Sequence, residues 1–178
     1  MTIKDERHFA KLVVPVKKVS FGDGYFRWSK RAAVRVYRNK IIAGEEAYRL
    51  IIARDGIEIH AATDAGAYYA TQTLRELVAI YGEVLPVCRI EDEPDFRRRG
   101  VYLDCSRGKV PKLNTLKELA TWLSHWKINE IQLYIENVFA FKKHPEIGRG
   151  YSPFTPEEII SFQEHCKKHH IRLVGSLS

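Results

Sequence analysis

GVYLDCSR, residues 100–107, is the stretch of sequence that decides the fold. Its first residues are mostly apolar and favour a β-strand of the kind that is buried in a sheet. Arg107 follows this strand almost at once, although packing gives an arginine no reason to be there. The stretch therefore predicts a buried strand whose C-terminal end carries a functional side chain.

A strand and helix pattern continues to the end of the chain. Each predicted helix has apolar residues on one face, and each further strand is a short apolar run. The links between them are short, so the strands are expected to run parallel with right-handed crossovers. The expected elements are a strand at 100–105, a helix at 113–126, a strand at 131–135, a helix at 156–169 and a strand at 171–175.

A parallel sheet buries both of its faces only when neighbouring elements complete it. The sequence stops at Ser178, directly after the third of these predicted strands. Two unpaired sheet edges favour association. They therefore predict a partner chain, self-association or further residues.

The first half of the chain is predicted to be an α+β module. Asp55-Gly56 separates two apolar runs, which is a strong signal for a β-hairpin. Apolar residues alternate in the second run, so Glu58 and His60 are expected to face away from the core. Gly22-Asp23-Gly24 is interpreted as a turn. The expected elements are strands at 12–14, 25–28, 33–37, 48–53, 57–61 and 86–90, and a helix at 67–80 that ends at Gly82.

The segment Glu91-Asp92-Glu93-Pro94-Asp95 is charged and contains a proline, which favours a domain boundary. We expect an α+β domain at residues 1–93, with a small antiparallel sheet and a helix. Residues 94–178 are expected to form an α/β domain, so the chain as a whole is assigned to the α/β class.

Composition and charge exclude several classes of protein. With 178 residues and 45% hydrophobic content, the chain can form one or two packed domains. The net charge is +7, but only Arg97-Arg98-Arg99 forms a tight basic cluster, and such a cluster at an element boundary is more typical of a solvated edge. No apolar run has the roughly 18 residues of a membrane span. We expect neither nucleic acid nor a membrane as a partner.

Three cysteines, Cys88, Cys105 and Cys166, occur at long spacings. An odd number at such spacings fits neither a disulfide framework nor a zinc ribbon, so reduced thiols and a cytoplasmic location are predicted. His165 and His169 lie near Cys166 and could bind zinc if further ligands converged. Positively charged groups also favour a helix C-terminus, so neither a metal nor another cofactor is predicted.

An ordered series of motifs adds a family resemblance. The motifs are DAGAYYATQTLR (64–75), IEDEPDF (90–96), Arg99-Gly100, Leu103-Asp104, Ser106-Arg107 and WKIN (126–129). In this order they resemble the β-N-acetylhexosaminidases of glycoside hydrolase family 20 over about residues 47–178. The stretch LYIENVFAF (133–141) is similar to the branch of that family with a Tyr-Ile-Glu signature in place of the commoner His-X-His-Leu-Thr-Asp.

The resemblance implies a TIM (β/α)8 barrel enzyme that removes terminal β-linked N-acetylglucosamine or N-acetylgalactosamine with retention and without metal. In this family the 2-acetamido group of the substrate attacks the anomeric carbon, assisted by an Asp-Glu pair after the fourth barrel strand. Only three such strands are predicted before Ser178. The resemblance therefore implies an incomplete barrel without a catalytic residue, inactive as an isolated chain.

Three residues are implied as substrate-binding. Arg107 matches the family arginine that hydrogen-bonds hydroxyls of the terminal sugar, a role that suits a rigid fork of donors. The aspartate of the family falls at Asn137, so Glu136 is the candidate for its carboxylate role. Asp104 is expected to support Arg107. The alternatives are a purely structural ion pair between Arg107 and Asp104, and one between Glu136 and a lysine.

Two other functions stay open. One is a non-catalytic carbohydrate-binding module, or one half of a split enzyme that a second chain completes. The other is a basic α+β protein that binds nucleic acid, which the net charge alone favours. Ser106 is not a candidate nucleophile, because no Gly-X-Ser-X-Gly motif surrounds it.

Overall fold

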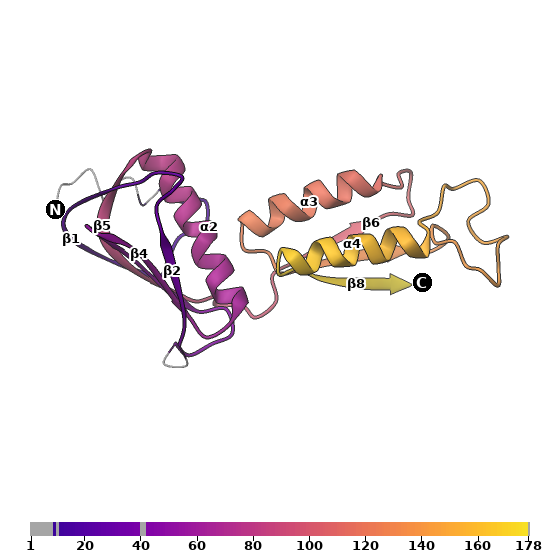
Figure 1. The fold of residues 1–178 in the computed structure, drawn as a ribbon. Helices are drawn as coiled ribbons and strands as arrows, with labels where there is room; N and C mark the ends of the chain where they lie inside the picture. The colour runs from indigo at the N-terminus through magenta and orange to yellow at the C-terminus, as the bar shows by residue number, and fades with distance from the viewer. Residues whose placement is uncertain (1–8, 10, 40–41, 178) are drawn as a thin grey trace. The chain divides into compact units, whose positions relative to one another are not determined.

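A computed structural model describes residues 9, 11–39 and 42–177. The chain divides into two compact units, residues 1–95 and 96–178 (Figure 1). Each unit consists of a sheet with helices on one face. None of the helices in the described ranges combines the length and apolar character needed to cross a membrane.

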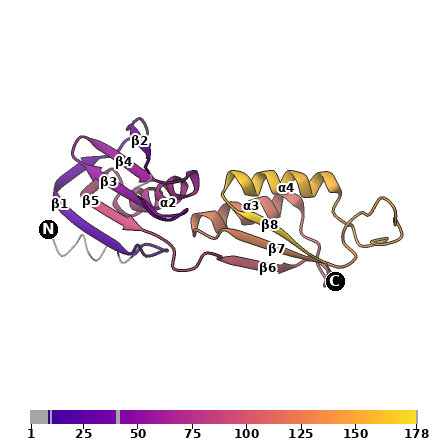
Figure 2. The ribbon, with the colours of Figure 1, turned by 90° about the horizontal axis from the view of Figure 1, so that it is seen from below.

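A five-stranded sheet in the order β1-β5-β3-β4-β2 forms the base of the first unit (Figure 2). β5 is antiparallel to both β1 and β3, and β3 forms the predicted hairpin with β4. β2 is parallel to β4, so the prediction of an antiparallel sheet is wrong at this edge. The chain does not form a hairpin from β2 to β3, and β2 instead pairs on the far side of β4. The strands are β1 (Lys18–Arg27), β2 (Val34–Arg38), β3 (Tyr48–Ala53), β4 (Gly56–Ala61) and β5 (Val84–Asp92).

Helix α2 (Asp64–Tyr81) covers one face of this sheet, as predicted. Thr63 caps its N-terminus, since the threonine hydroxyl accepts a hydrogen bond from the Gly66 N–H at 3.3 Å. Gly82 ends the helix with φ 70°, a left-handed conformation that glycine adopts at little cost. At Gly66 a Cβ atom would lie 2.4 Å from the carbonyl oxygen of Ala47, so only glycine lets the first turn approach this closely.

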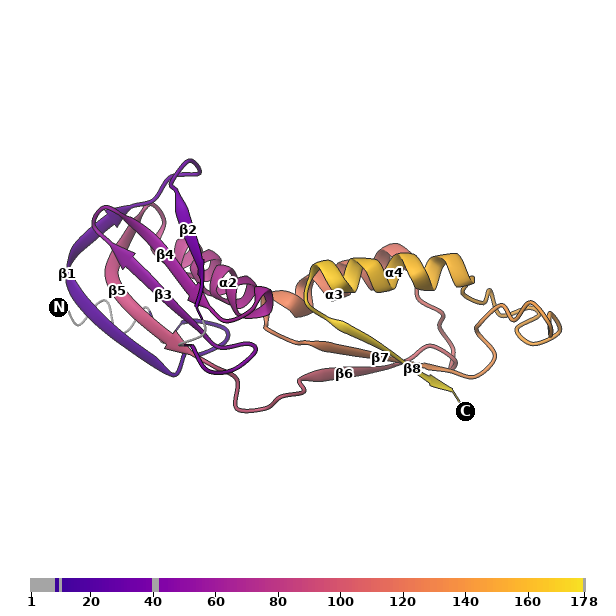
Figure 3. The same cartoon turned by 60° about the horizontal axis from the view of Figure 1, so that its bottom comes forward.

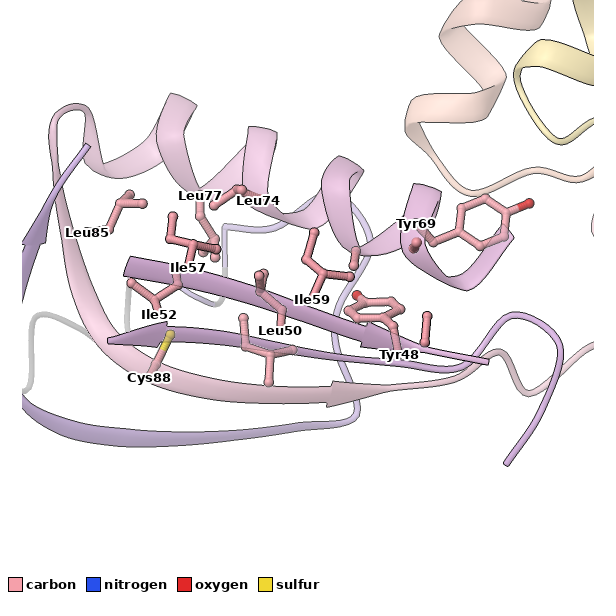
Figure 4. Close-up of a cluster of buried hydrophobic side chains, with 14 of the residues drawn as sticks. Tyr48, Leu50, Ile52, Ile57, Ile59, Tyr69, Leu74, Leu77, Leu85 and Cys88 are labelled. Atoms are coloured by element: carbon pink, nitrogen blue, oxygen red, sulfur yellow. The ribbon is translucent and has the colours of Figure 1, made fainter. Parts of the chain in front are cut away.

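The core of the first unit lies between α2 and the sheet (Figure 4). Leu50, Ile57 and Ile59 are completely buried there, and each such side chain stabilises the fold by about 1.5–3 kcal/mol. The alternation predicted for β4 is confirmed, because its apolar residues are buried while Glu58 and His60 are only partly so. Burying these alternate residues fixes the register of the hairpin.

Two predictions for the N-terminal part are wrong. Residues 12–14 form no strand, although Leu12 is buried in the core. Gly22-Asp23-Gly24 is not a turn between strands, because β1 runs through it with a register shift between Phe21 and Tyr25. Gly24 has φ 97°, which lets β1 take up two extra residues as a bulge.

The second unit is a three-stranded parallel sheet in the order β6-β7-β8, which confirms the predicted strand and helix alternation. Both helices lie on the same side of the strands (Figure 3). Thr155 and Glu158 form a capping box at the start of the second helix, and Pro156 occupies its first position. The elements are β6 (Gly100–Asp104), α3 (Leu113–His125), β7 (Glu130–Ile135), α4 (Pro156–Lys168) and β8 (Arg172–Leu177).

Residues 100–104 form the predicted strand, but the prediction that this strand is buried is wrong. β6 lies at an edge of the sheet, and the side chain of Tyr102 is on a face that no helix of this unit covers, so the residue is 55% exposed. Val101 and Leu103 point the other way and pack against the core under the helices. Along the uncovered face, Tyr102 lies beside Gln132 and Val174 in one cross-strand row.

Candidate functional site

The candidate site lies at the carboxyl ends of β6 and β7. These strands are parallel and in register, with Asp104 opposite Tyr134. Both strands therefore end at the same edge of the sheet, and the residues that follow them meet there. Arg107 follows β6 and Glu136 follows β7, so all three residues predicted from the sequence lie in one cluster.

Arg107 connects the two carboxylates. Its Nη1 donates to Asp104 Oδ2 at 2.6 Å, and its Nη2 donates to Glu136 Oε1 at 3.2 Å. The guanidinium carbon lies 5.2 Å from the centre of the Tyr134 ring, within cation–π range. Glu136 also accepts a hydrogen bond from the Tyr134 hydroxyl at 2.5 Å. The contacts hold a long and flexible side chain in one orientation.

Ser106 ties the two strand ends together through its backbone and side chain. Its N–H donates to Asp104 Oδ1 at 2.9 Å, and its hydroxyl oxygen accepts a hydrogen bond from the Glu136 N–H at 2.8 Å. The Asp104 carboxylate is thus held by the Ser106 N–H, and the Glu136 carboxylate by the Tyr134 hydroxyl, each in addition to Arg107. The cluster is pre-organised before any ligand arrives.

The electrostatics of the cluster favour the charged forms. Hydrogen bonds from the Ser106 N–H and then from Arg107 lower the pKa of Asp104. The hydrogen bond to Asp104 is also the main reason why the pKa of Arg107 is raised. The side chain of Arg107 stays 67% exposed. The cluster therefore presents an oriented, charged donor fork to a ligand.

Two supporting residues, Ser106 and Tyr134, were not predicted to be part of the cluster. The signal for Tyr134 was its place two residues before Glu136, since residues i and i+2 of a strand share a face. The role of Ser106 depends on the register between β6 and β7, and this register cannot be predicted from the sequence of either strand. Asn137 lies beside the cluster in sequence, and its buried Oδ1 has no hydrogen-bond partner among the described atoms.

The histidines considered as metal ligands make another contact. His165 Nε2 lies 3.0 Å from Thr121 Oγ1 of α3, and the rings of His165 and His169 are 4.6 Å apart. Cys166 points into the core, where burial raises its pKa to about 12. Within the described residues, no group of three or more His, Cys, Asp or Glu side chains is arranged to hold a metal ion.

Arg99 lies at the opposite end of β6 from the cluster. Its Nε donates to the Lys127 carbonyl at 2.8 Å, and its Nη1 donates to the Phe96 carbonyl at 2.7 Å. These contacts tie the strand start to neighbouring loops. Arg107 is the arginine at the end where parallel sheets of α/β proteins place their sites.

Comparison with known proteins finds a family model that matches most of the first unit. Residues 14–93 match the family described as glycosyl hydrolase family 20, domain 2. The β-N-acetylhexosaminidase of Cellulomonas fimi is 32% identical over 105 residues, which cover 57% of this chain and 21% of that protein. The N,N'-diacetylchitobiase of Vibrio harveyi is 37% identical over 98 residues, covering 53% of this chain and 11% of that protein.

Solved structures extend the likeness to the second unit. A β-N-acetylhexosaminidase from Bacteroides fragilis has a TM-score of 0.81 at 19% identity, covering 92% of this chain and 44% of that one. An exo β-N-acetylglucosaminidase from Vibrio harveyi has a TM-score of 0.79 at 20% identity, covering 93% and 36%. At such identities the likeness concerns the fold. The chain spans about a fifth of the length of the first curated relatives.

Proposed function

We propose that this chain is the N-terminal part of a β-N-acetylhexosaminidase of glycoside hydrolase family 20. The complete enzyme would release terminal β-linked N-acetylglucosamine or N-acetylgalactosamine from glycans. The names of the curated relatives support this activity. The chain is much shorter than those relatives, so the proposal concerns the larger protein to which it corresponds.

Residues 1–93 would form the α+β domain of this enzyme, and residues 94–178 the first three strands and two helices of its (β/α)8 barrel. The parallel order of β6, β7 and β8, with both helices on one side, supports the barrel assignment. Further strands would then pair with the free edges of β6 and β8. The uncovered face of the sheet would become the inside of the barrel.

The observation that carries the proposal is the fork of Arg107 between Asp104 and Glu136. Active sites of such barrels lie at the carboxyl ends of the strands, where this cluster lies. Arg107 would donate hydrogen bonds to hydroxyls of the terminal sugar, and Asp104 would orient it. Glu136 would be the second sugar contact, since a carboxylate accepts hydrogen bonds from hydroxyls.

None of these residues would carry out the bond cleavage. In the substrate-assisted mechanism the acetamido oxygen of the sugar attacks the anomeric carbon, and a carboxylic acid protonates the leaving oxygen. The Asp-Glu pair that assists these steps would lie after a fourth strand. The cluster around Arg107 would only hold the sugar in the reactive geometry.

Hydrolysis of p-nitrophenyl N-acetyl-β-glucosaminide by the purified 178-residue chain tests this division of roles. We expect no release of nitrophenol above the blank. Hydrolysis that disappears in Arg107→Ala or Glu136→Gln would contradict it, because a catalytic acid would then have to lie within these residues.

A cytoplasmic location stays a prediction from the cysteine pattern.

A second chain that completes the barrel is the alternative way to an active enzyme. It is favoured by the exposed Tyr102 on the uncovered face of the sheet. Self-association of this chain through the edges of β6 and β8 would use the same surfaces. Sedimentation of the purified chain over a range of concentrations distinguishes a monomer from such an assembly.

A further inference from the structure

A hollow lies on the face of the first sheet that α2 does not cover. Lys18, Ser20, Arg89 and Glu91 line it. In the pairing of β1 with β5, Lys18 lies opposite Glu91 and Ser20 lies opposite Arg89. The four side chains therefore form a square of two neighbouring cross-strand pairs on one face.

Three corners of this square are long side chains and the fourth is a serine. The space that the four side chains line has a volume of about 210 Å³. This is several times the ~30 Å³ that a water molecule occupies in the liquid. We call this space the Ser20 hollow.

The charges at the Ser20 hollow do not balance. Glu91 Oε1 accepts hydrogen bonds from Arg89 at 2.5 Å and from Arg49 at 2.9 Å. These bonds, with that from Arg89 first, lower the pKa of Glu91, so its carboxylate is ionised at neutral pH. Lys18 Nζ lies 3.9 Å from Glu91 Oε2. Three cations thus surround one carboxylate, and an excess of positive charge is left.

The donors at the Ser20 hollow are not used up by this carboxylate. At 3.9 Å the Lys18 ammonium is too far from Glu91 for a hydrogen bond. Arg89 donates hydrogen bonds to Glu91 through Nε and Nη2, so its Nη1 takes no part in that contact. Ser20 neighbours both cations in the sheet, since it is two residues from Lys18 on β1 and opposite Arg89 on β5. An oxyanion with several acceptor oxygens can accept hydrogen bonds from all three kinds of donor, namely the ammonium, the guanidinium edge and the hydroxyl.

We propose that the Ser20 hollow binds a tetrahedral oxyanion, either free phosphate or the phosphate group of an ester. Lys18 and Arg89 neutralise the anion, and the Ser20 hydroxyl donates to one of its oxygens. Glu91 holds Arg49 and Arg89 in place and limits how strongly the anion binds. The site lies in the first unit and does not depend on the sugar site of the second.

Titration of the ¹⁵N-labelled 178-residue chain with inorganic phosphate at pH 8 tests the proposal. We expect saturating shifts of the backbone amides around Lys18, Ser20 and Arg89, while the rest of the spectrum stays constant. Phenyl phosphate is the second arm of the experiment. Tighter binding of phenyl phosphate identifies an ester as the ligand, and equal or weaker binding identifies the free anion.

Variants separate a built site from general charge attraction. Lys18→Gln should weaken phosphate binding about tenfold or more, and Ser20→Ala about threefold, as expected for charged and neutral hydrogen bonds. Lys30→Gln is the matched control, because Lys30 is an exposed lysine beyond the other end of β1. This variant should bind phosphate as the unchanged chain does. Glu91→Gln should bind it more tightly, because a like charge is removed.

The proposal is overturned if no amide near Ser20 shows a saturating shift up to about 50 mM phosphate, where binding of even millimolar affinity would be complete. It is equally overturned if Lys18→Gln and Lys30→Gln weaken binding by the same factor. In each variant, an amide spectrum unchanged away from β1 and β5 shows that the chain is folded.

Discussion

The two sheets of this chain differ in what they carry on the face without helices. In the first sheet, ion pairs such as Arg49 with Glu91 cover that face. In the second sheet, the corresponding face carries the ion pair of Arg172 with Glu130 at one end. Tyr102, Tyr134 and Val174 lie further along this face, beside the uncharged Gln132 and Ser176. A charged face is stable in water, whereas a parallel sheet normally has both faces covered. The first sheet is complete as it stands, and the second has a surface suited to further packing.

The largest expected effect is on the stability of the two units, compared through one cavity mutation in the core of each. Leu77 belongs to the core of the first unit and Leu133 to that of the second, and both are almost completely buried. Leu77→Ala and Leu133→Ala should each lower the free energy of unfolding of their own unit by about 2–5 kcal/mol. Hydrogen exchange of amides assigned to each unit measures this. Equal destabilisation of both units by either mutation would contradict two separate cores.

The uncovered face of the second sheet should cause association. Tyr102→Ser removes an exposed aromatic ring from that face, and we expect it to weaken self-association about tenfold, the effect of losing about 1.4 kcal/mol of apolar contact. Tyr37→Ser is the matched control, since Tyr37 is 40% exposed on the first sheet. Sedimentation equilibrium measures both variants. A larger effect of Tyr37→Ser would assign the association to the first sheet.

The smallest expected effect is the acid dependence of the cluster at Arg107. The pKa of Asp104 is lower in the folded chain than its ordinary value, so its contacts stabilise fully above that value. This stabilisation is lost as the pH falls through the lowered pKa. The difference in unfolding temperature between the unchanged chain and Asp104→Asn should therefore shrink from pH 7 to about pH 3. A difference that grows on acidification would have the wrong sign.

The sequence predicted best what local chemistry controls. Gly82 correctly predicted the end of α2, and Asp55-Gly56 correctly predicted the hairpin of β3 with β4. The turn predicted at Gly22-Asp23-Gly24 is wrong, because glycines suit a bulge as well as a turn. The pairing of β1 with β5 decides between the two. Pairing between distant segments also decides that β2 runs parallel to β4 and that β6 lies at an edge.

Contacts between distant segments also limited what could be predicted of the candidate site. Arg107, Asp104 and Glu136 were found from the resemblance and from their places at strand ends. Ser106 was considered only as a nucleophile, yet its hydroxyl accepts the Glu136 N–H across 30 positions of sequence. Such a contact follows from the register of two strands, and the apolar pattern of each strand alone does not fix that register.

A barrel exchange tests the central claim, that Arg107 positions the sugar, most directly. Residues 96–178 would replace the matching segment of the β-N-acetylhexosaminidase of Cellulomonas fimi, and kcat/KM for p-nitrophenyl N-acetyl-β-glucosaminide would be measured. Arg107→Ala should lower kcat/KM about 10- to 100-fold, the effect of losing charged hydrogen bonds to the sugar. Arg98→Ala, an exposed arginine at the other end of β6, should change it less than about twofold, since exposed side chains without such contacts contribute little. An exchanged enzyme that is equally active with and without Arg107 would contradict the claim.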